Sequence, residues 1–317
     1  MDTFGTRFRL EIFGASHSPC VGVTLRDVPA ALPLAPEDFT HDLLRRKSGA
    51  PGTTPRIEDD LPQLEDRRTS DGTLTIRFAN RNYRDEDYKD FTDIPRPGHA
   101  DFVAMARYGS LRNGWFSGRM TLPLVAAGVV AKKIIAPVHI EARLVEVGGV
   151  STEDSAAVAQ ALEAASAAGD SLGGLIECRC TAVPVGLGEP FFDSLESLLA
   201  HAVFSIPGIR GIAFGDGFAA ARMTGSAHND PFIDAAGHTA RNGAGGINGG
   251  LSNGNPVVFR VAVKPTSSIR KTQRTFDFAQ GQLVDYSVPG RHDVCFALRV
   301  PPVVEAVTAC VFANLML

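Results

Sequence analysis

The densest glycine run of the chain most constrains its fold. Between Asn242 and Gly254, six of thirteen residues are glycine, and an alternating segment follows that ends in Lys264, Pro265, Thr266, Ser267 and Ser268. Glycine adopts backbone conformations closed to other residues and can approach a ligand closely, with N–H groups turned toward an anion. We therefore expect a loop and then a strand, with one cation and three hydroxyls at the strand's end. The alternative is an ordinary mobile loop.

Composition places the chain among globular proteins. Its 317 residues are 44% hydrophobic and 21% charged, and the net charge is −4. These values exclude a disordered chain, and the lack of a basic excess argues against a nucleic-acid partner. No apolar run reaches the roughly 18 residues that cross a membrane, so no membrane partner is expected. Positive charge gathers locally at Arg45, Arg46 and Lys47, which suits a small anionic substrate.

The cysteines indicate a reducing compartment. They are odd in number and scattered, at Cys20, Cys178, Cys180, Cys295 and Cys310, so they form no disulfide framework. Cys178 and Cys180 lie two apart in a strand-like run and are expected to be buried apolar residues, with no metal site. The N-terminus lacks the basic-then-apolar order of a signal peptide, and a cytoplasmic location is expected.

Hydrophobic periodicity predicts a mixed α and β fold. Strands and helices mix without strict alternation, which favours α+β layers over a doubly wound parallel sheet. Length alone allows one domain or two. Residues 80–99 are expected to form a long loop. Strands are predicted at 7–13, 21–26, 73–78, 139–150, 174–183, 211–214, 257–263 and 294–300, and helices at 35–47, 101–108, 121–135, 152–168, 195–204 and 302–317.

Two short motifs match known functional patterns in the wrong context. Gly215 to Ala220 matches the dinucleotide-binding pattern G-x-G-x-x-A, with Asp234 beyond it. Turn-forming residues follow instead of a long helix, so a glycine-rich hairpin is the better interpretation. Gly250 to Gly254 matches the G-x-S-x-G nucleophile elbow, but a proline and a strand follow where a helix is required.

Three titratable residues lie in loops that suit chemistry. They are His17 in GASHS, His99 in RPGHAD and Asp293 in GRHD. Two imidazoles can act as general acids near neutral pH and a carboxylate can act as a base. Taken singly, a loop histidine is more often a capping or surface residue.

Four arginines are candidates for binding a multiply anionic substrate, since guanidinium groups grip carboxylates and phosphates. They are Arg45, Arg46, Arg119 and Arg291. The alternative is solvated surface charge, which fits Arg45 best.

Several segments follow one another along the chain in an order typical of one protein family. They are TFGTRFRLEIFGASHS, RRKSG at 45–49, RPGHAD at 96–101, ARYG at 106–109, VAAGVVAKK at 125–133, AGDSLGG at 168–174, PVGLGEP at 184–190, SIP with the following residues to 218, the glycine run with KPTSSI, and the later GRHD. Any one motif is weak, but the whole set in this order is specific. The chain resembles the chorismate synthase family along nearly its whole length.

The resemblance implies a fold and an activity. The family converts 5-enolpyruvylshikimate 3-phosphate to chorismate by 1,4-elimination of phosphate, and it requires reduced FMN although the reaction has no net redox change. NADPH is a further candidate cofactor. The implied subunit is a single domain over 1–317, a β-α-β sandwich of antiparallel sheets and helices, and the implied assembly is a homotetramer.

The resemblance also implies residue roles. His17 would act as an acid near the departing phosphate, His99 would protonate or hydrogen-bond the reduced flavin, and Asp293 would help to remove the substrate proton. Arg46 and Arg119 would bind substrate, with Arg46 also near any nicotinamide cofactor. The residues implied to bind FMN are Ser117, Pro207, Gly208, Gly249, Lys264, Thr266, Ser267, Ser268 and Arg291.

The chain departs from the family's motifs at several positions. In the family's G-G-G-R-S-S-A-R-E-T, Trp115 and Phe116 stand where an arginine and a serine are expected, and Met120 replaces the glutamate. Gly52 stands where another arginine is expected, while Ala15 and Ser18 replace the Glu and the last Gly of G-E-S-H-G. Three interpretations therefore stay open: a divergent chorismate synthase, a related FMN-dependent lyase or flavoenzyme with an altered substrate, and a non-catalytic paralogue.

Overall fold

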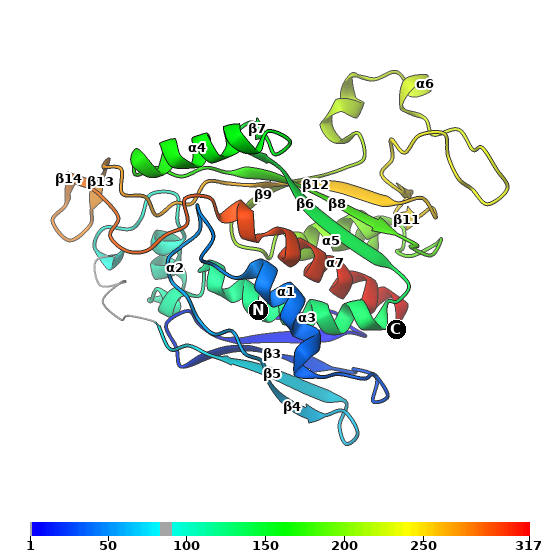
Figure 1. The fold of residues 1–317 in the computed structure, drawn as a ribbon, viewed down its shortest axis with the longest axis horizontal. Coiled ribbons are helices and arrows are strands. Elements are labelled where there is room, and N and C mark those ends of the chain that lie inside the picture. Colours follow the sequence, from blue (N-terminus) through cyan, green and yellow to red (C-terminus); the bar gives the residue numbers. More distant parts are fainter. Residues whose placement is uncertain (1, 83–90) are drawn as a thin grey trace.

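Two antiparallel five-stranded sheets enclose a layer of helices (Figure 1). The computed structural model describes residues 2–82 and 91–317. The first sheet has the order β1-β2-β3-β5-β4 and the second β7-β6-β8-β12-β9. Their strands are β1 (Thr3–Phe4), β2 (Arg9–Gly14), β3 (Cys20–Arg26), β4 (Gln63–Arg67), β5 (Thr73–Ala79), β6 (His139–Val147), β7 (Val150–Ser151), β8 (Gly174–Thr181), β9 (Ile209–Phe214) and β12 (Val257–Val263).

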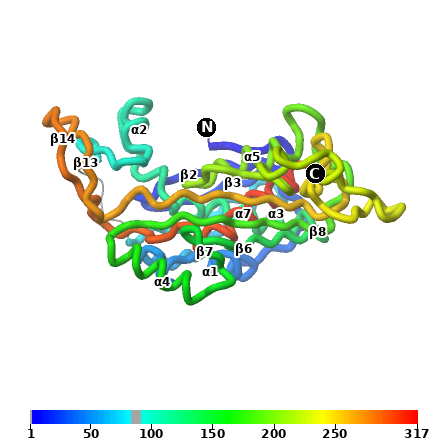
Figure 2. Tube along the Cα trace, turned by 90° about the horizontal axis from the view of Figure 1, so that it is seen from above, coloured from blue at the N-terminus to red at the C-terminus, as the bar shows by residue number. Residues whose placement is uncertain are grey.

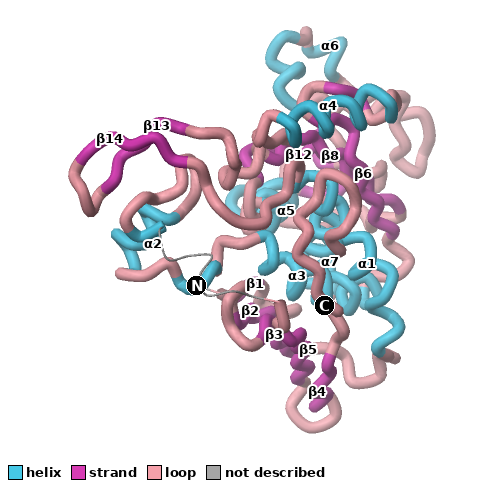
Figure 3. Tube along the Cα trace, turned by 60° about the vertical axis from the view of Figure 1, so that its left-hand side comes forward, coloured by secondary structure: helices cyan, strands magenta, loops and turns pink. Residues whose placement is uncertain are grey.

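The helices between the sheets form the core. They are α1 (Thr40–Arg46), α3 (Thr121–Ile134), α5 (Leu195–Val203) and α7 (Pro301–Met316), as Figures 1 and 3 show. All of α7 from Pro301 to Ala313 is buried, as expected of a helix covered on every side. Gly128 allows α3 and α7 to cross closely, because a Cβ at that position would collide with Ala306. These layers confirm the predicted β-α-β sandwich.

The remaining elements lie outside this sandwich. Helix α2 (Asp101–Tyr108) and the hairpin of β13 (Gln273–Asp277) and β14 (Gln282–Tyr286) lie at one end of the molecule. The segment with α6 (Gly225–His228) and the small hairpin of β10 (Ile247–Asn248) and β11 (Leu251–Ser252) lies at the other end (Figures 1 and 2). Helix α4 (Ser155–Ala167) lies beside β7 at the edge of the second sheet.

Several sequence predictions were wrong in detail. Residues 294–300 are not a strand, since Phe296–Arg299 forms a 3-10 helix, and Gly217–Arg222 forms a 3-10 helix instead of a hairpin. Helix α4 begins later than predicted because Asp154, not Ser151 or Thr152, caps it by accepting a hydrogen bond from the N–H of Ala157 (2.9 Å). Strand β4 and the β13–β14 hairpin were not predicted.

Other predictions were confirmed, and one concerns a loop that lies partly outside the described residues. The strand at 257–263 and the helix at 101–108 have the predicted bounds. Cys178 and Cys180 are fully buried, as predicted. Part of the loop predicted at 80–99 lies outside the described residues. Among the described residues, no helix is long and apolar enough to cross a membrane.

Candidate active site

A cavity of about 820 Å³ collects nearly all of the predicted site residues. Its size lies in the range of pockets that bury small-molecule ligands. Gly249 does not line the cavity; it occupies the turn between β10 and β11. The predicted residues that do line it are His17, Arg46, His99, Ser117, Arg119, Pro207, Gly208, Lys264, Thr266, Ser267, Ser268, Arg291 and Asp293.

The loop that carries His17 joins β2 to β3 and is held by side chains from elsewhere in the chain. Asn80, at the end of β5, donates from Nδ2 to the carbonyl oxygens of Ala15 (3.0 Å) and Ser18 (2.7 Å). Arg56 donates from Nη1 to Ser16 Oγ (2.9 Å) and pairs with Glu58. Neither Asn80 nor Arg56 was predicted as part of the site.

His99 sits in a charged network just before α2. Its Nδ1 lies 2.7 Å from Asp101 Oδ1 and 3.0 Å from Arg96 Nη2. Burial opposes ionisation of Asp101, but hydrogen bonds from Arg96 and His99 hold the pKa of its carboxyl well below the usual range. An ionised Asp101 fixes the proton on Nδ1 of His99, which leaves Nε2 as the other functional ring nitrogen. Burial lowers the pKa of His99 itself.

The polar residues after β12 contact the same loop. Lys264 Nζ and Ser267 Oγ each donate to the carbonyl oxygen of Gly98 (2.8 Å in both cases). Arg96 donates from Nη1 to Ser268 Oγ (3.1 Å). The buried hydroxyl of Thr266 has no hydrogen-bond partner among the described residues. Burial lowers the pKa of Lys264.

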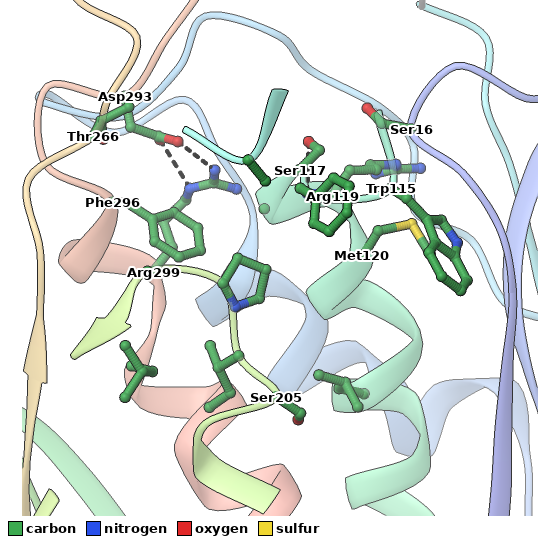
Figure 4. Close-up of a pocket in the computed structure, with 18 of the residues that line it drawn as sticks. Ser16, Trp115, Ser117, Arg119, Met120, Ser205, Thr266, Asp293, Phe296 and Arg299 are labelled. Carbon is green, nitrogen blue, oxygen red and sulfur yellow. Dashed lines mark hydrogen bonds and ion pairs between the residues drawn. The ribbon is translucent and has the colours of Figure 1, made fainter. Parts of the chain in front are cut away.

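Asp293 is fixed by a bidentate ion pair. Arg299 donates from Nε and Nη2 to its two carboxylate oxygens (3.1 and 2.7 Å), and the backbone N–H of Thr54 donates to Oδ1 (2.8 Å). Figure 4 shows this pair at one side of the pocket and Trp115 at the other. Arg299 was missed because its segment was predicted as a strand; the 3-10 helix turns the guanidinium back toward Asp293.

A buried carboxylate links the two arginines predicted to bind substrate. Asp60 pairs through Oδ2 with Arg46 (2.9 Å) and through Oδ1 with Arg119. Burial opposes ionisation of Asp60, but the charges of Arg46 and Arg119 lower its pKa. Burial lowers the pKa of Arg46 to about 10. The only sequence signal for Asp60 was the charge-rich stretch that follows Pro55.

Arg45, which was also considered for anion binding, belongs elsewhere. Its guanidinium forms two hydrogen bonds of 2.7 and 2.6 Å with Glu305 of α7, and it does not line the cavity. It is therefore neither a substrate ligand here nor a solvated surface charge. The neighbouring Arg46 points into the site because successive helix residues face different directions.

Ser117, Pro207, Gly208 and Arg291 line further parts of the wall. Ser117 caps the 3-10 helix Gly118–Met120, because its Oγ accepts a hydrogen bond from the backbone N–H of Arg119 (3.2 Å). The carbonyl oxygen of Gly208 accepts from the backbone N–H of Lys264 (2.8 Å). Arg291 donates from Nη1 to Asn82 Oδ1 (3.3 Å).

The charge balance of the described lining favours an anion. Seven lysine and arginine side chains face four carboxylates there. Two guanidinium nitrogens that belong to lining residues, Arg46 Nε and Arg119 Nη2, are buried without a hydrogen-bond partner among the described residues. Such donors favour ligands that carry carboxylate or phosphate groups. Two imidazoles and a carboxylate beside them can exchange protons with a bound anion.

Comparisons with known proteins find relatives that match nearly the whole chain. A family model described as chorismate synthase matches residues 8–317. A chorismate synthase of Chitinophaga pinensis is 55% identical over 100% of this chain and 97% of its own length. One from Desulfovibrio desulfuricans is 40% identical, over 100% of this chain and 97% of its own length.

A solved structure shares the fold. The structure titled "Crystal Structure of Chorismate Synthase" superimposes with a TM-score of 0.75, covers 99% of this chain and 92% of its own, and is 23% identical in sequence.

Proposed function

The chain belongs to the chorismate synthase family and is a carbon–oxygen lyase of the shikimate pathway. We propose that this cavity carries out the family's 1,4-elimination of phosphate from 5-enolpyruvylshikimate 3-phosphate. We propose also that reduced FMN binds there beside the substrate. One observation carries the proposal: His17, His99 and Asp293 line a single cavity that also holds an excess of arginine and lysine.

The residues present fit an anionic cofactor. Lys264 and the hydroxyls of Thr266, Ser267 and Ser268 cluster at the end of β12, and the Thr266 hydroxyl is buried without a partner in the described part of the chain. We assign these residues, with Ser117, Pro207, Gly208 and Arg291, to FMN. Gly249 stays a proposed FMN contact only if another copy of the chain supplies it. When bound, reduced FMN would supply electron density that helps phosphate to leave.

The anionic substrate would be bound by the arginines. Its two carboxylates and phosphate need several cations, and Arg46 and Arg119 are already held in place by Asp60. Such preorganisation stabilises a departing anion without moving side chains during the reaction. Arg46 is also the proposed contact for NADPH, should the protein reduce its own flavin.

The three titratable residues would divide the proton transfers. His17 would donate a proton or hydrogen bond to the departing phosphate. His99, whose Nδ1 proton is directed to Asp101, would offer Nε2 to the flavin. Asp293, held by Arg299, would take part in removing the substrate proton. A fixed carboxylate and two oriented imidazoles lower the barrier mainly through orientation.

We also propose a cytoplasmic homotetramer. All five cysteines are free, which fits a reducing compartment. Large apolar side chains are exposed on the subunit, among them Phe191 (85%), Phe192 (92%) and Phe218 (85%), which suits contact with other copies. Light scattering during size-exclusion chromatography measures the mass of the assembly, and a monomeric mass would contradict the tetramer.

The proposed function is tested by anaerobic turnover. Wild-type protein, chemically reduced FMN and 5-enolpyruvylshikimate 3-phosphate should give chorismate and phosphate together, and His17→Ala should abolish turnover while flavin still binds. His41→Ala is a matched control, because His41 is exposed and does not line the cavity. Flavin binding without affinity for the shikimate phosphate would favour an altered substrate. Unchanged behaviour of His17→Ala and His99→Ala would favour a non-catalytic paralogue.

A further inference from the structure

Two hydrogen bonds join the loop of His17 to the segment just before α3. The indole Nε1 of Trp115 donates to the carbonyl oxygen of Gly14 (2.8 Å). The backbone N–H of His17 donates to the carbonyl oxygen of Asn113 (2.9 Å). The first bond holds the start of the loop and the second holds His17 itself, so residues 113–115 set how far His17 reaches into the cavity.

The segment that makes these bonds has an unusual backbone. Arg112, Asn113 and Gly114 all have positive φ, at 51°, 51° and 80°. This left-handed region is costly for residues other than glycine, and consecutive examples persist only where surrounding contacts require them. Here the contacts are the bond from His17 and a stack in which the Arg112 guanidinium lies 4.0 Å from the Trp115 ring and 4.8 Å from the Tyr108 ring.

Two of the chain's departures from the family's motifs act on this same loop. Trp115 replaces an arginine, and its ring places the N–H that binds Gly14. Ser18 replaces a glycine, and its hydroxyl accepts a hydrogen bond from the N–H of Ala15 (2.8 Å) and lies 2.7 Å from the carbonyl oxygen of Cys20. An arginine in that position would bring a charge and five N–H donors, whereas the indole offers a single neutral N–H. The two departures therefore support one loop together.

We propose that Trp115 is a positioning residue for His17: its indole N–H, together with the backbone of Asn113, fastens the 14–20 loop and so fixes the imidazole in the cavity. This inference rests on the role of His17 in the proposed function. It differs from a role in which Trp115 stacks on the flavin, because it depends on the N–H and not on the ring face.

The test is Trp115→Phe, which removes the N–H and keeps an aromatic ring. We expect kcat to fall about tenfold, since small misplacements of a reacting group are costly, while KM and the affinity for reduced FMN change less than about twofold. The alkaline limb of the kcat profile against pH should move, because His17 has to stay protonated to act as an acid and its imidazole would lie in altered surroundings. Hydrogen–deuterium exchange of residues 14–20 should become faster.

Tyr108→Phe is the matched control. It also removes one polar atom from an aromatic ring that touches Arg112, and Tyr108 does not line the cavity. It should leave kcat and exchange unchanged. Unchanged kcat and exchange in Trp115→Phe would overturn the proposal, and so would weaker flavin binding with unchanged kcat. If the wild type shows no turnover, the proposed function fails separately, and the exchange measurement, which needs no activity, still decides whether Trp115 fastens the loop.

Discussion

Replacing Asp60 by asparagine should destabilise the protein strongly. The Asp60 side chain is 3% exposed and pairs with Arg46 and Arg119, whose side chains are 3% and 6% exposed. Removing one partner of a buried ion pair typically costs about 3–5 kcal/mol, because the remaining charge stays buried. Asparagine keeps one acceptor oxygen and tolerates the positive φ of 56° at this position. We therefore expect a loss of about 3 kcal/mol in the free energy of unfolding.

Urea unfolding, followed by the fluorescence of the single tryptophan, measures this loss. With a slope of about 3 kcal/mol per molar, the midpoint should fall by about 1 M. Because the folded pKa of Asp60 is lowered, its contribution is complete above the unfolded pKa of about 3.9 and is lost only as pH falls through the folded value. The difference between Asp60→Asn and wild type should therefore be constant from about pH 8 to about pH 5.

The neighbouring Asp59 provides the control. It pairs with Arg81 at 3.2 Å, but the two side chains are 65% and 75% exposed. An exposed pair contributes about 0–1 kcal/mol, so Asp59→Asn should move the midpoint little. Equal losses for Asp59→Asn and Asp60→Asn would refute the argument that Asp60 neutralises two buried arginines.

Three further predictions concern His99 and Arg299, which line the cavity, and Gly52, which does not. His99→Gln should flatten the dependence of stability on pH below about 6.5. Burial lowers the folded pKa of His99, so wild-type stability falls in this range as the unfolded state takes up a proton. Urea unfolding that gives the same change of unfolding free energy with pH for both proteins would contradict this prediction. Gly52→Arg, which restores the family's arginine, should lower the free energy of unfolding by about 1–3 kcal/mol. The reason is that φ at Gly52 is +83° and an added Cβ would lie 2.9 Å from Leu298. Gly52→Ala adds the Cβ without the charge, and an unchanged urea midpoint for it would count against backbone strain. Arg299→Lys should lower kcat/KM about tenfold to a hundredfold with flavin binding unchanged, because lysine cannot hold Asp293 by two parallel bonds; wild-type kinetics would contradict it.

Local patterns predicted most of the layers of the fold. Val257–Val263 alternates buried and more exposed residues. The apolar helices are long, and prolines lie near both ends of α3 and at the start of α7, so each element carries its own signal. The β13–β14 hairpin was missed because its strands alternate weakly and pack on little else. The 3-10 turn at Phe296–Arg299 was missed because its apolar residues resemble a strand, while its conformation depends on the ion pair to Asp293.

The candidate active site also combines residues that local motifs indicate with residues that they do not. His17, His99 and Asp293 were singled out because their motifs are short and local, and the resemblance implied their roles. Three supporting residues lie outside these motifs: Asn80 holds the loop of His17, Asp60 pairs with Arg46 and Arg119, and Arg299 pairs with Asp293. Only the folded chain shows these contacts. Gly249 shows the reverse: its motif predicted a flavin contact, but the turn it occupies lies away from this chain's cavity.

The most direct test of the account is a single anaerobic turnover with enzyme in excess over substrate. Chorismate, phosphate and the flavin absorbance would be measured in the same sample. The account predicts one chorismate and one phosphate per substrate, with the flavin still fully reduced at the end, since the cavity would perform an elimination with no net redox change. Oxidation of the flavin in step with substrate loss, or no product from flavin-loaded protein, would contradict it.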